Sequence, residues 1–228
     1  ADADEVLRLW SGLGYYARAR NLHRAARAIV ETQGGRFPLD VGQAQALPGI
    51  GRSTAAAIVA FATGERHAIL DGNVKRVLAR HFGVEGAVDS APVLARLWEI
   101  SGSLVPAKGV EDYTQGLMDL GATVCTRTRP DCEACPLRAD CVARREGATD
   151  RLPGRKSSRP ARQREVAMLA IVRRGEVLVE KRPAAGIWGG LWSLPEAPAG
   201  TDAAECVRRD YGLRVDAVEA LVPFRHAF

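Results

Sequence analysis

A change of hydrophobic period at one short basic segment constrains the fold of this chain more than any other sequence feature. The segment is RLPGRKSSRPARQR, residues 151–164, with six basic residues and no acidic one. Residues 1–150 hold 18 Lys+Arg and 18 Asp+Glu, and residues 165–228 hold eight and nine, so the whole positive excess of the chain, net +5, lies in this segment. Its Pro, Gly and Ser content predicts an exposed linker. It either lies along a polyanion or is a solvated tether, and composition alone leaves both open.

The half before the segment has a helical period throughout. Residues 4–14 and 21–32 place apolar side chains at i, i+3 and i+4 spacing. The same reasoning predicts helices over 53–63, 73–81, 91–104 and 111–124. We therefore expect an all-α domain over residues 1–150.

The half after the segment, residues 165–228, has a strand-like period. Residues 165–183 are predicted to form two strands around a turn at Arg174 and Gly175, and a Gly/Trp/Pro-rich loop is predicted over 186–200. A helix over about 201–211 and a strand over 213–224 are expected to follow. These elements make a small α+β domain, so the chain as a whole is predicted to be multi-domain.

The apolar runs and the start of the chain indicate whether a membrane span or a secretory signal is to be expected. No apolar run reaches about 18 residues, so no membrane span is predicted. The start, ADADEVLRLW, lacks the pattern of a secretory signal. It also lacks a Met and begins inside a helical pattern, so we expect a piece of a longer protein.

Four cysteines lie within 17 residues, in the spacing C-x6-C-x2-C-x5-C. Four thiolates this close can hold one tetrahedral zinc or one [4Fe–4S] cluster. Disulfides are the alternative, but nothing in the sequence indicates an oxidising compartment. The uneven spacing favours iron–sulfur, and the first loop, 126–129, is expected to be a solvent-facing basic finger. The predicted ligands are Cys125, Cys132, Cys135 and Cys141, whereas Cys206 is expected to pack in a core.

A glycine-punctuated stretch, LPGIGRST at 47–54, predicts two helices joined by a hairpin. Pro48 stiffens the turn, and the glycines allow a ligand to approach backbone N–H groups beside a helix N-terminus. Such amides suit a phosphate, as in hairpins that hold a DNA backbone without reading its sequence. A tight corner between two helices is the alternative. The residues expected to lie at the DNA backbone are Leu47, Gly49, Gly51 and Ser53.

An aspartate follows the hairpin in ILDGNVKRVLAR, residues 69–80. Asp71 precedes a predicted helix, where an aspartate is usually an N-cap. A carboxylate there can also stabilise a developing positive charge in glycoside hydrolysis. The hairpin, this aspartate and the four cysteines form a much rarer combination than any one of them.

The order of these three motifs resembles the helix-hairpin-helix DNA glycosylases with an iron–sulfur cluster, the endonuclease III superfamily. Three further stretches resemble its adenine DNA glycosylase family: GLGYYARARNL (12–22), MDLGATVCTRTRPDC (118–132) and GLWSLP (190–195). The resemblance covers essentially all of the chain. It implies a [4Fe–4S] cluster as cofactor and a monomeric bacterial protein of the cytoplasm. It also implies double-stranded DNA with A:8-oxoguanine or A:G mispairs as partner, from which the adenine is removed.

The resemblance also implies roles for single residues. Asp71 would support the oxocarbenium-like sugar, and Asn73 would lie near the flipped nucleotide. Tyr15 would be the aromatic wedge beside the oxidised guanine, because an inserted ring can replace lost stacking. Packing in a core is the alternative for Tyr15. Arg18 and Arg20 fit phosphate contacts.

Ser53 bears on the type of reaction. Relatives that also cleave the sugar strand carry a lysine at this position, whose amine can form a Schiff base. A hydroxyl cannot, so Ser53 predicts hydrolysis without strand cleavage. Lys75 is the nearest other amine in sequence, and we expect it to face phosphate or solvent. In this family a glutamate acts as the acid that protonates the adenine. That glutamate belongs to an upstream segment that this sequence does not include.

Residues 165–228 resemble the Nudix-like domain with which that family inspects 8-oxoguanine. Glu196 and Glu205 fit a hydrolysing Nudix box, but Arg208 and Arg209 stand where its metal-binding Glu-Glu pair would be. Arginine cannot ligate Mg²⁺, so binding without hydrolysis is predicted. Phe228 would belong to the tip that reaches the oxidised base.

Three other functions are weighed against an adenine glycosylase. They are an endonuclease III-like pyrimidine glycosylase, a non-catalytic iron–sulfur DNA-binding module, and a Nudix pyrophosphatase.

Overall fold

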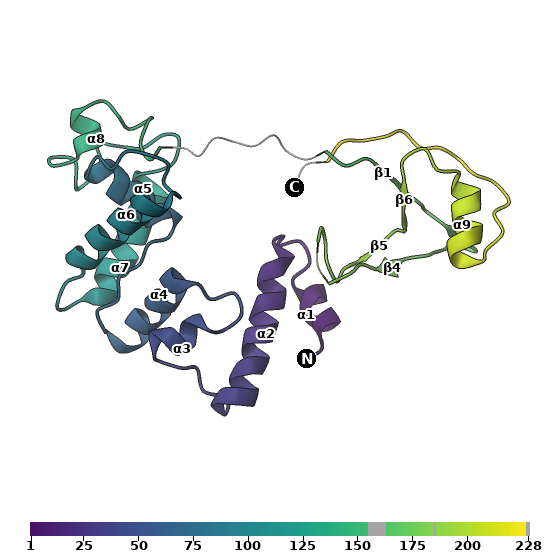
Figure 1. Cartoon of the computed structure of the whole chain (residues 1–228), viewed down its shortest axis with the longest axis horizontal. Coiled ribbons are helices and arrows are strands. Elements are labelled where there is room, and N and C mark those ends of the chain that lie inside the picture. Colours follow the sequence, from purple (N-terminus) through teal and green to yellow (C-terminus); the bar gives the residue numbers. More distant parts are fainter. Residues whose placement is uncertain (155–162, 185, 227–228) are drawn as a thin grey trace. The chain divides into compact units, whose positions relative to one another are not determined.

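The computed structural model describes residues 1–154, 163–184 and 186–226, which fall into two compact units (Figure 1). The first unit is Ala1–Arg159 and the second is Pro160–Phe228. Most of the basic segment expected as a linker, and Phe228, lie outside the described residues.

The first unit is helical, as its period predicts. Its helices are α1 (Ala3–Leu9), α2 (Tyr16–Gln33), α3 (Val41–Gln45), α4 (Arg52–Thr63), α5 (Gly72–His81), α6 (Ala91–Leu104), α7 (Val110–Asp119), the π-helix η1 (Leu120–Val124) and α8 (Val142–Arg145). The single helix expected over 111–124 is therefore two elements, because the chain switches at Leu120 to wider π-type hydrogen bonding. No helix in the described part of the chain is long and apolar enough to cross a membrane.

Local chemistry fixes where these helices begin and end. Asp2, Asp40 and Asp71 accept backbone N–H bonds at the starts of α1, α3 and α5, as N-cap residues do. Gly34 and Gly64 end α2 and α4 in the left-handed conformation, which costs a glycine little.

Apolar side chains of α5, α6 and α7 form the main core of this unit. Its buried members are Ala56, Ile69, Leu70, Val74, Val77, Leu78, Ala79, Leu97, Ile100 and Leu117. Ile69 and Leu70 come directly before α5, so the segment that leads to Asp71 is anchored in this core.

The described part of the second unit contains short antiparallel strand pairs and one helix. The strands are β1 (Val166–Met168), β2 (Val172–Arg173), β3 (Glu176–Val177), β4 (Glu180–Lys181), β5 (Trp192–Ser193) and β6 (Glu196–Pro198), and the helix is α9 (Ala203–Tyr211). β1 pairs with β6, β2 with β3, and β4 with β5. Arg174 and Gly175 both have positive φ and form the two-residue turn between β2 and β3, where a turn was predicted.

Two strand predictions for this unit are corrected. The run 165–183 does not fold back on itself as one hairpin, because its outer parts pair with β5 and β6 instead. No strand is assigned over 213–224, since none of the described strands pairs with those residues. Leu221, Val222 and Phe224 are 76%, 89% and 85% exposed there. Cys206 is buried in the core between α9 and the β1–β6 pair, as expected.

Candidate DNA-binding and catalytic site

The stretch 47–51 forms a tight turn between α3 and α4. The Ile50 N–H donates to the Leu47 carbonyl at 3.1 Å, and Gly49 has a φ of +78°. A Cβ on Gly49 would lie 2.5 Å from the Cβ of Asn21, so only glycine allows this approach to α2. Gly51 is the N-cap of α4 and faces open space, whereas the side chain of Leu47 is buried. The hairpin predicted from the sequence is therefore present, with Leu47 contributing to the core.

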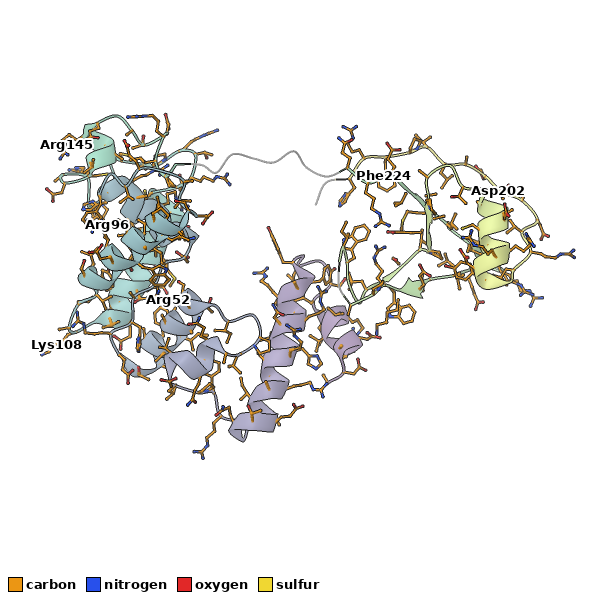
Figure 2. All side chains as sticks on the ribbon, viewed as in Figure 1. Arg52, Arg96, Lys108, Arg145, Asp202 and Phe224 are labelled. Atoms are coloured by element: carbon orange, nitrogen blue, oxygen red, sulfur yellow. The ribbon has the colours of Figure 1, made fainter. Side chains whose placement is uncertain are left out.

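The first turn of α4 carries two side chains that point in different directions, one to solvent and one into the protein. Arg52, labelled in Figure 2, is exposed, and its guanidinium carbon lies 3.8 Å from the ring centroid of Trp98. Ser53 points into the protein, where its Oγ accepts a hydrogen bond of 2.9 Å from the Leu70 N–H. Ser53 thus joins the hairpin directly to the segment before Asp71.

Asp71 and Asn73 lie at the start of α5. One carboxylate oxygen of Asp71 accepts the Val74 N–H at 2.8 Å, so Asp71 is the N-cap that its position indicates. That bond fixes the carboxylate relative to the helix and leaves its second oxygen for other contacts. Asp71 and Asn73 are both half-buried.

Arg76 joins this helix start to the cysteine loop. Its guanidinium donates to the Asn73 Oδ1 at 2.8 Å and, from Nε, to the Cys125 carbonyl at 2.7 Å. It also donates to the carbonyls of Gly72 and Gly121. Burial lowers the pKa of Arg76, and the nearby Cys125 and Asp71 oppose that shift. Because Oδ1 of Asn73 is held by Arg76, the amide NH₂ of Asn73 is directed away from it.

Gly121, in the π-helix, allows η1 to approach α5 closely. A Cβ there would lie 2.6 Å from the Cβ of Asn73 and 3.0 Å from its backbone. A side chain at this position would have to displace the start of α5, so the glycine is a packing requirement of the site.

Lys75 forms an ion pair that the sequence did not indicate. Its Nζ lies 2.8 Å from an Asp89 carboxylate oxygen, and the lysine side chain is 23% exposed. The expectation that it faces phosphate or solvent stays a prediction beside this pairing.

Tyr15 is 81% exposed and has a left-handed φ of +47° at the start of α2. The core-packing alternative for Tyr15 is therefore excluded. The Arg18 guanidinium lies 5.2 Å from the Tyr15 ring centroid and 5.9 Å from that of Trp10. Arg20, two residues further along the same helix, is half-buried.

The four clustered cysteines line one cavity, together with residues of α5 that include Arg80 and His81. All four are free thiols in the structure, as is Cys206, which argues against disulfides. Burial raises the pKa of the Cys132 thiol, and its neighbours Cys125, Cys141 and Cys135 raise it further. Among the described residues, no group of three or more His, Cys, Asp and Glu side chains is arranged to hold a single metal ion.

Arg80, which lines this cavity, joins the start of the cysteine loop to the residues that follow α8. Only 3% exposed, it donates to the carbonyls of Thr126, Arg127, Thr149 and Leu152. Its Nη1 lies 3.4 Å from the Cys125 Sγ. In the expected basic finger, Arg127 and Arg129 are exposed, but Thr126 is half-buried and donates to the Arg129 carbonyl.

In the second unit, the residues of the Nudix-like box are engaged in ion pairs. Glu196 accepts hydrogen bonds from Arg182 and Arg164, and the bond from Arg182 is the main cause that holds the pKa of Glu196 below its usual value. Arg209 pairs with Asp210 at 2.6 Å. Glu196 thus has two cationic partners, and one of the arginines at the metal-binding positions of the box is itself paired with a carboxylate.

Sequence reasoning missed Arg76, Arg80 and Ser101 as parts of the site. Ser101, which is 1% exposed, donates to the Ile69 carbonyl at 2.7 Å. Arg76 lies three residues after Asn73 and so on the same helix face, which was a usable signal. The partners of the other two lie 32 or more residues away, and no local pattern indicates them.

Comparisons with known proteins agree with these features. The family model for the HhH-GPD superfamily base excision DNA repair protein matches residues 1–102, and that for the NUDIX domain matches 166–228. A solved structure titled as a thermostable thymine-DNA glycosylase has a TM-score of 0.57 and 32% identity, covering 64% of this chain and 67% of that one. An endonuclease III–DNA complex has a TM-score of 0.55 and 24% identity over similar shares, 64% and 67%, and supports the fold alone. The chain belongs to the HhH-GPD superfamily of base excision DNA repair proteins.

Within that superfamily, the chain is similar to adenine DNA glycosylases along almost all of its length. The one from Buchnera aphidicola subsp. Acyrthosiphon pisum is 33% identical over 225 residues, 99% of this chain and 64% of the relative. The one from Homo sapiens is 33% identical over 241 residues, 86% of this chain and 44% of the relative. The chain therefore spans less than two thirds of either relative. The family resemblance and the fold class drawn from the motifs are confirmed.

Proposed function

We propose that the protein containing this chain is an adenine DNA glycosylase that hydrolyses the N-glycosidic bond of adenine mispaired with 8-oxoguanine or guanine. The observation that carries the proposal is the direct hydrogen bond from the Leu70 N–H to the Ser53 Oγ, which joins the segment that leads to Asp71 to the residue that follows the hairpin. A hairpin that holds the DNA backbone and a carboxylate that faces the sugar must lie side by side. This bond joins them within two residues of Asp71.

Asp71 is the residue we assign to the sugar. As the glycosidic bond breaks, positive charge develops on the sugar, and an ionised carboxylate stabilises it. The cap bond to Val74 keeps that carboxylate in one orientation, so little reorganisation is needed when the charge appears. Asn73, with its amide oriented by Arg76, is assigned to the extruded nucleotide.

Hydrolysis without strand cleavage follows from Ser53 and Lys75. A strand-cleaving mechanism needs an amine that attacks the sugar. Ser53 offers a hydroxyl that is already bonded to Leu70, and the Lys75 amine is paired with Asp89. Water is therefore the proposed final nucleophile.

We assign a [4Fe–4S] cluster to the cavity lined by Cys125, Cys132, Cys135 and Cys141. Each thiolate of such a cluster binds a different iron, so the cysteines stand further apart than around a single zinc ion. The wall of the cavity also suits an acceptor-rich, anionic group. His81 has a buried Nδ1 with no hydrogen-bond partner among the described residues, and Arg80 is directed at the Cys125 sulfur. When bound, the cluster would tie the loop 125–141 to α5.

DNA contacts are assigned to the exposed features around the hairpin. Backbone N–H groups near Gly49 and Gly51 are proposed to hold phosphates. Tyr15, exposed and backed by Arg18, is proposed as the wedge that enters the duplex. Arg20 and Lys75 complete the proposed DNA contacts, with Lys75 exchanging Asp89 for phosphate.

The second unit is proposed to inspect 8-oxoguanine without hydrolysing a nucleotide. The ion pairs of Glu196, and the arginines in place of the Glu-Glu pair, support that assignment. Phe228, proposed for the contact with the oxidised base, lies outside the described residues.

A substrate panel with the full-length protein tests the function. Duplexes carrying A:8-oxoguanine, A:G, A:T or an oxidised pyrimidine are incubated with it, and released bases and strand breaks are measured separately. Adenine release from the first two, with strand breaks only after alkali, is expected. Release of pyrimidines alone would replace the proposal with the endonuclease III-like function. DNA binding with no base release would leave a binding module. Borohydride trapping of a covalent complex would refute the monofunctional mechanism.

A further inference from the structure

Both polar groups of a single peptide bond, the one between Ile69 and Leu70, are held by serine hydroxyls from two different helices. The Ser101 Oγ of α6 donates to the Ile69 carbonyl at 2.7 Å. The Leu70 N–H donates to the Ser53 Oγ of α4 at 2.9 Å. In a trans peptide these two groups point in opposite directions, so the two hydroxyls fix opposite edges of one plane.

We infer that Ser53 and Ser101 are positioning residues that set the place of the Asp71 carboxylate relative to DNA held by the hairpin. This inference rests on the proposed function. It gives Ser53 a structural role, in addition to the chemical consequence that no lysine amine stands at this position.

Burial makes this peptide a rigid support. Ile69 and Leu70 are 2% and 4% exposed, and Ser101 is 1% exposed. A buried peptide group that loses its partner carries the full cost of desolvation, so the two hydroxyls strongly favour one orientation of the plane. The peptide cannot rotate without breaking at least one of these bonds.

The hydroxyls of Ser53 and Ser101 together form a clamp on the 69–70 peptide. This peptide ends one residue before Asp71, and Asp71 is fixed on its other side by its bond to Val74. The cap bond orients the carboxylate relative to α5 alone. The clamp orients the start of α5 relative to α4, whose first turn carries Ser53 directly after the hairpin. The distance between the bound DNA backbone and the carboxylate is therefore set through Ser53, with Ser101 supporting the same peptide from behind.

A loss of positioning differs from a loss of binding. A displacement of about 1 Å in a catalytic group can lower a rate by roughly 10²-fold. The hairpin's own contacts to phosphate do not pass through the 69–70 peptide. The clamp thus predicts slower base release at unchanged DNA affinity, a combination that general destabilisation does not produce.

The test measures single-turnover base release and DNA affinity for four variants of the full-length protein: Ser53→Ala, Ser101→Ala, the double variant, and Ser53→Thr, which keeps the hydroxyl. Ser103→Ala is the matched control, since Ser103 lies on α6 and donates to the Ile100 carbonyl of its own helix. Each alanine variant is expected to slow release by about tenfold or more while the Kd stays within about twofold. Ser53→Thr is expected to retain most of the rate. The double variant should lose less than the product of the two single losses, because both hydroxyls hold one peptide.

Rates within about twofold of the wild type in both folded alanine variants would overturn the inference, as would weaker DNA binding at an unchanged rate. Amide hydrogen exchange supplies a readout that needs no activity. The Leu70 amide should be protected in the wild type and exchange faster in Ser53→Ala, while the Val74 amide keeps its protection. If the wild type releases no base from any duplex, the proposed function fails, and the clamp is judged on exchange alone. A Leu70 amide that exchanges rapidly in the wild type overturns the clamp, even where a variant does not fold.

Discussion

Replacing Arg80 with lysine tests how one buried guanidinium holds the cysteine loop. Arg80 is 3% exposed and donates to four carbonyls, at 2.7 Å to Thr126, 2.8 Å to Leu152, 3.1 Å to Thr149 and 3.2 Å to Arg127. These carbonyls belong to two segments far apart in sequence, 126–127 and 149–152. A lysine keeps the charge but presents its donors at one point.

The cost follows from the carbonyls that lose a partner. An ammonium group in place of the guanidinium cannot reach both segments, so at least two carbonyls are left unpaired. Each unpaired buried polar group costs about 1–3 kcal/mol, which gives a loss of roughly 2–6 kcal/mol for Arg80→Lys. That is a large share of the stability of an ordinary domain.

Urea denaturation followed by helical circular dichroism measures this loss. Arg96→Lys is the control, because Arg96 is 58% exposed and forms a surface pair with Glu99. The control should change the free energy of unfolding by less than about 0.5 kcal/mol. A loss below about 1 kcal/mol for Arg80→Lys would show that the carbonyls find other partners, and the reasoning would be refuted.

Two further predictions concern close packing and charge. Gly121→Ala places a Cβ 2.6 Å from that of Asn73, so it should destabilise the fold by about 1–3 kcal/mol in urea unfolding. Gly116→Ala should not destabilise the fold, because a Cβ at Gly116 would have no heavy atom within 4 Å. An equal loss of stability in the two variants would contradict the packing argument. An NMR titration should place the pKa of Glu196 below its usual value of 4.5, and Arg182→Met should raise it. A carboxyl group with a lowered pKa stabilises the fold at pH values above its usual pKa, and this stabilisation is lost as the pH falls through the lowered pKa. The difference in the free energy of unfolding between the wild type and Arg182→Met should therefore vanish in acid. An unshifted pKa in the wild type would refute the pairing.

The elements that the sequence predicted well are those in which one local pattern decides the structure. α6 was predicted with its observed bounds, because its apolar period and the proline near its start act within the helix itself. The hairpin was predicted because Gly49 and Pro48 leave few alternative turns. Asp71 was predicted both as a cap and as the carboxylate that stabilises the sugar cation, and the structure shows that the cap geometry uses one carboxylate oxygen.

The features that the sequence could not supply depend on distant partners. The 213–224 run has the composition of a strand, but a strand exists only where another strand pairs with it. Ser101 looked like one polar residue in an apolar helix, and only the fold brings the Ile69 carbonyl to it. The inward direction of the Ser53 hydroxyl was hidden for the same reason.

Replacing Asp71 with asparagine in the full-length protein tests the central claim most directly. Asparagine is as good an N-cap as aspartate, so α5 and the overall stability should be preserved while the negative charge is lost. Single-turnover adenine release from a duplex with A:8-oxoguanine is the measurement. We expect release by the wild type, and a rate lower by roughly 10²-fold or more in Asp71→Asn at similar DNA affinity. Equal rates in the two proteins would show that Asp71 is only a helix cap and does not stabilise the sugar cation.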